Sequence, residues 1–184
     1  MTISMPGFPP ISDRDHIRGP EAAEFNLIQY GDFECPQSRQ VYVMARGLMK
    51  AHPEKIRLVY RHFPVRIHPN ALAAGEAAEA ASSQDAFWEM HDHLFSNQLS
   101  LSAEDLIKHA EDIGIDAREV RMALDEGVFR EKVLVQKRGA VKAGVRSSLN
   151  LVVDGALYED DGVMDAVVEL DDRLGEQYGR EIAV

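Results

Sequence analysis

Residues 25–49, FNLIQYGDFECPQSRQVYVMARGLM, decide the fold and contain the only cysteine of the chain, Cys35. Residues 25–30 are mostly apolar, partly β-branched or aromatic, and are followed by Gly-Asp, so they predict a buried strand. Apolar residues then recur at helical spacing over residues 41–48. Pro36 suits the first turn of that helix, where an amide hydrogen would have no partner. Cys35 is therefore predicted to lie at a helix N-terminus, just beyond the end of a strand.

This position matters because the unpaired amides and the positive dipole end of a helix stabilise an anion. A thiolate at Cys35 is favoured there relative to the thiol. The alternative is that Cys35 packs as a small buried hydrophobic residue, as most lone cysteines do. The strand end, the helix start and Pro36 together favour the reactive position.

Composition limits the classes of protein and of partner. The chain has 184 residues, 45% of them apolar, enough for one domain or one domain with an insertion. Its net charge is −11 without a basic stripe, which argues against nucleic acid and anionic membrane surfaces as partners. No apolar run is long enough to predict a span of the bilayer.

Cysteine usage and the first residues bear on the compartment. One cysteine cannot form a disulfide within the chain. The first 20 residues lack the basic and apolar regions of a secretory signal. A reducing, cytoplasmic location is therefore expected.

The outer parts of the chain differ in pattern. Residues 1–20 carry four prolines and few periodic apolar positions, which predicts an extended N-terminal arm. Residues 56–60 predict a second strand, so the first strand, the helix and this strand form a right-handed parallel βαβ unit. Residues 67–143 are almost wholly helical in pattern and predict an inserted helical subdomain.

The sheet resumes after the helical block. Residues 151–158 predict two short strands joined at Asp154-Gly155, a pair that suits a type I′ turn. Apolar spacing over residues 163–174 predicts a closing amphipathic helix. The α/β core is thus expected at residues 21–66 and 144–180.

Several spaced motifs, in this order, resemble the DsbA-like branch of the thioredoxin-fold family. They are YGDFECP at 30–36, DH at 15–16 with GP at 19–20, RHFP at 61–64 with HP at 68–69, the alanine–glutamate run at 73–80, and FWEMHD at 87–92. The resemblance covers about residues 15–178. It implies a thioredoxin fold (βαβ–ββα) with an all-helical insertion and thiol–disulfide oxidoreductase activity.

The loop of this chain departs from the family pattern at the second thiol. Family members carry Cys-x-x-Cys, whereas Cys35 is followed here by Pro36, Gln37 and Ser38. Cys35 therefore cannot close a disulfide within the chain and cannot act as a dithiol oxidant. Ser38, one helical turn along, is expected to donate a hydrogen bond to the thiolate. Pro36 and Gln37 complete the predicted active-site loop.

Two further positions differ from the family. Gln29 stands where members carry a buried acid, so a proton relay through that side chain is lost. Leu149, after Ser148, stands at the position of a cis-proline that faces the cysteine and helps to bind substrate. A non-proline cis bond costs about 2.5–4 kcal/mol, so the peptide before Leu149 is expected to be trans.

Four histidines are candidates for metal binding or catalysis. His91 and His93 point to different faces of a helix, and no third ligand stands at motif spacing, so no metal is predicted and His93 is expected to pair with Glu89. His62 and His68 flank a proline near the second strand, where a hydrogen-bonded turn is favoured over a catalytic role.

The leading hypothesis is a monothiol enzyme in which Cys35 exchanges with a thiol or disulfide substrate, either glutathione or a protein. No bound cofactor is expected, and glutathione is the candidate co-substrate. The alternatives are a redox-inactive thioredoxin-fold binding or structural module, a glutathione transferase or isomerase, and an iron–sulfur cluster bridging two chains. A homodimer is compatible with the sequence.

Overall fold

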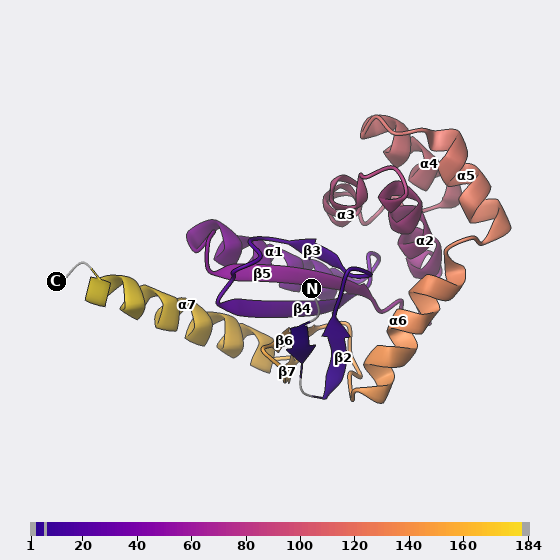
Figure 1. The fold of residues 1–184 in the computed structure, drawn as a ribbon. Helices are drawn as coiled ribbons and strands as arrows, with labels where there is room; N and C mark the ends of the chain where they lie inside the picture. Colours follow the sequence, from indigo (N-terminus) through magenta and orange to yellow (C-terminus); the bar gives the residue numbers. More distant parts are fainter. Residues whose placement is uncertain (1–2, 6, 182–184) are drawn as a thin grey trace.

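The protein is described by a computed structural model that covers residues 3–5 and 7–181. A five-stranded mixed sheet with the order β3-β5-β4-β6-β7 forms its centre, and a separate hairpin pairs β1 with β2 (Figure 1). The strands are β1 Ile3–Met5, β2 Phe8–Ile11, β3 His16–Arg18, β4 Phe25–Gly31, β5 Ile56–His62, β6 Asn150–Val153 and β7 Ala156–Glu159.

The predicted βαβ unit is confirmed. Strands β4 and β5 run parallel in register from the pair Phe25–Ile56 to the pair Gly31–His62. Helix α1, Pro36–Ala51, connects them and starts with proline in its first turn. Nearly every residue of β4 and all of β5 are buried, because helices cover both faces of the sheet.

The two faces bury alternate residues of the central strands. On one face, Leu27 and Leu58 pack against α1 and against α7, Gly162–Glu181. On the other face, Ile28 and Val59 pack with residues of β2 and of α6, Arg130–Lys142. This two-sided burial is the reason that the strands read as apolar runs rather than as alternating patterns.

The predicted helical block is present and lies beside the sheet (Figure 1). Its helices are α2 Ala71–Ser82, α3 Phe87–Ser96, α4 Ala103–Asp112 and α5 Ala117–Glu126. Ser102 and Asp105 form a capping box at the start of α4. Asp116 caps α5 by accepting a hydrogen bond from the amide of Arg118.

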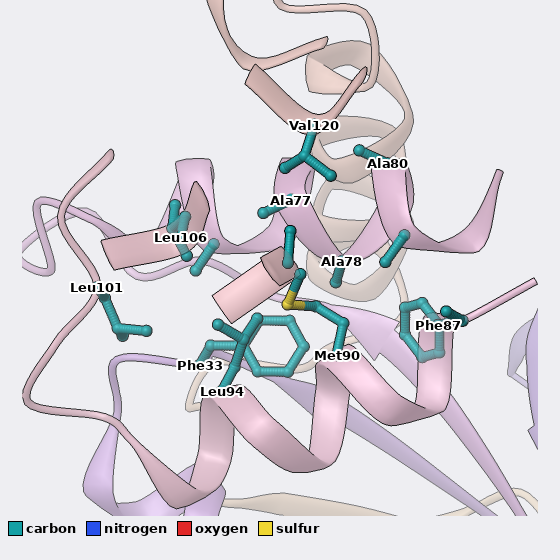
Figure 2. Close-up of a cluster of buried hydrophobic side chains, with 14 of the residues drawn as sticks. Phe33, Ala77, Ala78, Ala80, Phe87, Met90, Leu94, Leu101, Leu106 and Val120 are labelled. Carbon is teal, nitrogen blue, oxygen red and sulfur yellow. The ribbon is translucent and has the colours of Figure 1, made fainter. Parts of the chain in front are cut away.

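Phe33 joins the loop before Cys35 to this helical block. Its buried ring lies among apolar side chains of α2 and α3, including Met90 and Leu94 (Figure 2). The many alanines of α2 let neighbouring helices approach closely around the ring. The inserted helices therefore pack against the cysteine loop through Phe33.

The predicted hairpin near the C-terminus is also confirmed. Strands β6 and β7 pair antiparallel around Asp154 and Gly155. Both residues have positive φ, 46° and 93°, as a type I′ turn requires.

The N-terminal residues form more structure than the expected extended arm. Strand β3 pairs antiparallel with β5 and forms one edge of the sheet. Asp15 accepts two hydrogen bonds from the guanidinium of Arg61, at 2.7 and 2.8 Å, and both side chains are buried. The sequence pattern missed these strands because each is only three or four residues long. Residues 1–2 and 6 of the predicted arm lie outside the described residues.

None of the helices within residues 7–181 is long and apolar enough to cross a membrane.

His91 lies in the aromatic part of the helical core. Its ring is fully buried among Phe33, Tyr60 and Phe95, and Nδ1 is 2.9 Å from Oδ1 of Asp92. Burial outweighs the hydrogen bond and the charge of Asp92 and lowers the pKa of His91 to about 4. The imidazole is therefore neutral at neutral pH.

We expect acid to destabilise the protein through His91. An unfolded histidine takes up a proton near pH 6.5, while the folded one resists protonation down to about pH 4, so this stability is present above pH 6.5 and is lost below it. The loss between pH 7 and pH 4.5 is on the order of 2 kcal/mol. Urea unfolding at both pH values should show it, and His91→Leu should lack it. An equal pH dependence in His91→Leu and in wild type would contradict this assignment.

We also expect Asp15→Ala to lower the free energy of unfolding by about 3 kcal/mol, since it leaves the charge of Arg61 buried and unpaired. Asp13→Ala, at an exposed neighbouring position, is the matched control and should change stability little. The measurement is urea unfolding followed by circular dichroism, and equal stabilities of the two variants would count against the ion pair.

Candidate functional site

The loop before Cys35 is held by the buried carboxylate of Asp32. Its Oδ1 accepts the amide of Glu34 at 2.8 Å. Its Oδ2 accepts the amide of Val65 and faces Nδ1 of His68, each at 2.7 Å. The loop after β4 is thereby fixed to the loop after β5. His68 thus contacts the cysteine loop through Asp32, as part of the turn.

Cys35 occupies the N-cap position of α1, as predicted. Its backbone is extended, with φ −85° and ψ 121°, and its side chain makes no capping hydrogen bond to the helix amides. The residue is only 2% exposed, so it is buried, but its surroundings are polar. The thiol donates to Oε1 of Gln37 at 3.0 Å, and Sγ accepts from Oγ of Ser148 at 3.0 Å.

The structure corrects the predicted role of Ser38. Its hydroxyl donates its one proton to the carbonyl of Ser148 at 2.8 Å and accepts from the amide of Asp32 at 3.0 Å. No proton of Ser38 is left for the sulfur in this arrangement. Ser38 instead joins the loop that contains Ser148 to the cysteine loop, and Ser148 supplies the hydroxyl that reaches Sγ.

Gln29 is fully buried, as expected for the position of the missing acid. Its Nε2 donates to the carbonyl of Ser38 at 2.8 Å. Its Oε1 has no hydrogen-bond partner among the described residues. The side chain therefore fixes the first turn of α1 but carries no titratable proton.

The Ser148–Leu149 peptide is trans, as predicted, since no cis peptide occurs in the described part of the chain. Asn150, which sequence reasoning missed, positions this loop. Its side chain pairs with both backbone groups of Tyr30, at 3.0 and 2.7 Å, and donates to the carbonyl of Ser147 at 2.7 Å. A polar residue in a short strand gave no distinct signal for this role.

Gln98 is a second residue that the sequence did not reveal. It lies in the connection between α3 and α4, and its Nε2 donates to the carbonyls of Phe33 and Cys35, at 2.7 and 2.9 Å. The helical insertion thus holds the backbone of the cysteine itself.

Glu34 does not direct its carboxylate to the thiol. Its two oxygens accept from the backbone amide and from Nδ2 of Asn70, at 2.6 and 3.0 Å. The charge of this neighbour is therefore compensated at the start of α2.

His62 belongs to a buried network away from the sulfur. Nε2 of His62 and Nε2 of His16 lie 2.9 and 3.0 Å from the same oxygen of Glu79, and Lys132 pairs with its other oxygen. Burial alone would raise the pKa of Glu79, but the hydrogen bonds from both histidines lower it well below its ordinary value. Burial also lowers the pKa of His62, so a neutral imidazole of His62 lies beside the carboxylate of Glu79.

These contacts define what the site can do. One sulfur stands at a helix start whose amides lack a capping side chain, beside one hydroxyl donor and the amide side chain of the exposed Gln37. Such a group is suited to nucleophilic attack as a thiolate. Because the chain has one cysteine, any disulfide formed must be with another molecule.

The comparisons with known proteins agree with this fold. A family model described as "Thioredoxin" matches residues 12–170. The Na(+)/H(+) antiporter NhaA 1 of Salinispora arenicola is 46% identical over 131 residues, which are 71% of this chain and 18% of that protein. NhaA of Herminiimonas arsenicoxydans is 34% identical over 148 residues, 80% of this chain and 24% of that protein. The chain thus spans only about a fifth of the length of these relatives.

Solved structures show the same architecture at low identity. A thioredoxin-like oxidoreductase from Silicibacter pomeroyi has a TM-score of 0.74 at 21% identity and covers 88% of this chain and 94% of its own. BdbD from Bacillus subtilis has a TM-score of 0.74 at 18% identity, over 94% and 95% of the two chains. Because the family model matches most of its length, this chain belongs to the thioredoxin family, and its fold is that of DsbA-like structures.

Proposed function

We propose that the protein catalyses monothiol thiol–disulfide exchange through Cys35. The observation that carries the proposal is the uncapped start of α1, where Cys35 sits with a hydroxyl donor already directed at its sulfur. A thiolate there would accept hydrogen bonds from the amides of the first helical turn, which have no capping partner while the thiol is neutral. The family match supports oxidoreductase chemistry in general, and the single cysteine limits it to one thiol.

The exchange proceeds in two balanced steps. The Cys35 thiolate attacks one sulfur of a substrate disulfide, a bond forms between these sulfurs, and the other substrate sulfur leaves as a thiolate that takes up a proton. A second, external thiol then loses its proton and attacks the substrate sulfur of the mixed disulfide, so that a new disulfide forms between these two sulfurs and Cys35 leaves as a thiolate. The half of the substrate that left first is reduced to a thiol, and the external thiol is oxidised. We propose glutathione as the small-molecule member of this exchange.

Gln37 and Ser148 respond differently when Cys35 loses its proton and its sulfur becomes negatively charged. Oε1 of Gln37 accepts from the thiol and would repel a thiolate, so the exposed Gln37 side chain must turn its amide hydrogens toward the sulfur or move away. That motion also uncovers the buried sulfur for an incoming disulfide. Ser148 keeps donating throughout, because its hydroxyl faces Sγ while Ser38 holds its backbone carbonyl.

A glutathione adduct tests the proposal. Native protein incubated with glutathione disulfide should gain one glutathionyl group at Cys35, and reduced glutathione should remove it. Intact-mass spectrometry follows both steps, with Cys35→Ser as the control that stays unmodified. An adduct that forms only after denaturation would overturn the proposal, because the sulfur would then be inaccessible in the folded protein.

Ser148→Ala should slow alkylation of Cys35 by iodoacetamide at pH 7 about tenfold. A hydrogen bond to a charged group is worth about 1.5 kcal/mol or more, so its loss lowers the thiolate fraction by that factor. Ser147→Ala is the control, since Ser147 lies in the same loop as Ser148 and its hydroxyl contacts Leu149 and Asp160. Equal slowing in both variants would assign the effect to the loop and not to the bond with Sγ.

A second candidate is a redox-silent binding or structural module. The observation in its favour is the 2% exposure of Cys35, whose thiol proton is already bonded to Gln37. The relatives are antiporters in which the similar region makes up about a fifth of the length. Such a module would therefore act as a domain attached to a larger protein. The glutathione experiment separates the two functions, since a module needs no reactive thiol.

A further inference from the structure

Two histidines and one carboxylate converge where α3 packs on α4, away from the thiol. His93 comes from α3, and His109 and Asp112 come from α4. One ring nitrogen of each histidine and one oxygen of Asp112 all lie within 4.8 Å of one another. The predicted partner of His93 was Glu89; the structure instead places Nε2 of His93 3.8 Å from Oδ2 of Asp112. The third ligand that motif spacing lacked is supplied by the packing of the two helices.

His109 has the hydrogen bonding of a prepared metal ligand. The residue is 6% exposed, and its Nε2 lies 2.7 Å from the carbonyl of Ser100, which can only accept. Nε2 therefore carries the proton, and the lone pair is on Nδ1. That Nδ1 is buried and has no hydrogen-bond partner in the described part of the chain. Metal-bound histidines characteristically donate their other N–H to a carbonyl or carboxylate in this way.

The other two side chains of the cluster, those of His93 and Asp112, are reachable from solvent. Both side chains are partly exposed, at 28% and 40%, which leaves one side of the cluster open to water.

We propose that His93, His109 and Asp112 bind a divalent late transition-metal ion, with Zn²⁺ as the representative. Two imidazoles and a carboxylate with an open fourth position for water are a ligand set that zinc accepts. Tetrahedral ligands at about 2.0–2.1 Å from zinc lie about 3.3 Å apart. The exposed side chains of His93 and Asp112 close the remaining distance, while the buried His109 stays in place.

The second cluster of this kind does not suit a cation. There both oxygens of Glu79 are already used, one by His16 and His62 and the other by Lys132. The ammonium of Lys132 would lie beside the ion. No buried nitrogen of His16 or His62 is without a partner among the described residues.

Lys108 competes with a metal ion for one of the three proposed ligands, Asp112. Its ammonium lies 2.8 and 2.9 Å from the two oxygens of Asp112, four residues along α4. This pair is solvent-exposed and links residues i and i+4 of one helix, a kind of ion pair that contributes little. A bound divalent ion would displace it, so removing Lys108 should strengthen binding.

Zinc titration of the tag-free chain in the Cys35→Ser background tests the site without interference from the thiol. We expect one equivalent of Zn²⁺ to bind, measured by competition with a chromophoric chelator. His93→Gln and Asp112→Asn, both at partly exposed positions, should each weaken binding at least about tenfold, because even outer-shell changes cost 10–100-fold. Lys108→Gln should bind zinc at least as tightly as the background.

A control variant distinguishes binding at the proposed site from binding at the second cluster. His16→Gln should leave the zinc affinity unchanged, since His16 belongs to the second cluster. Cobalt bound to the Cys35→Ser chain should give a visible spectrum that His93→Gln abolishes. The proposal is overturned if no single equivalent binds, if His93→Gln and Asp112→Asn retain full affinity, or if His16→Gln alone removes binding.

Discussion

The buried carboxylate of Asp32 joins the ends of the two central strands. It binds an amide on its own loop, an amide on the loop after β5 and the ring of His68. Hydrogen bonds to a charged acceptor are worth about 1.5–3 kcal/mol each, so this group strongly fixes both loops. The position of Cys35 depends on this, because the next residues turn directly into α1.

A second layer of contacts fixes the cysteine from outside the strand–helix unit. Gln98 reaches from the helical insertion to the carbonyl of Cys35, and Ser38 reaches from α1 to the carbonyl of Ser148. Phe33 fills the space beneath the inserted helices (Figure 2). The thiol is thus enclosed by three separate parts of the chain. It is buried, yet the atoms next to it are polar.

Several residues that carry the family resemblance have structural tasks. Asp15 pairs with Arg61 across β3 and β5, and His16 with His62 binds Glu79 of α2. These pairs connect the N-terminal strand, the central sheet and the helical block through buried charges. Breaking one partner of a buried pair costs several kcal/mol, so such residues are constrained without touching the thiol.

The sequence by itself determined the βαβ and hairpin elements, the helical block and the helix-start position of Cys35. Each of these depends on local signals, namely apolar periodicity, a proline in the first turn and an Asp-Gly turn. Tertiary structure decided which hydroxyl reaches the sulfur, because Ser38 and Ser148 are 110 residues apart and the hydroxyl of Ser38 is used by the carbonyl of Ser148. It also decided the partners of Asn150, Gln98 and His109. Side-chain hydrogen bonds between distant elements depend on packing geometry, which leaves no periodic trace in the sequence.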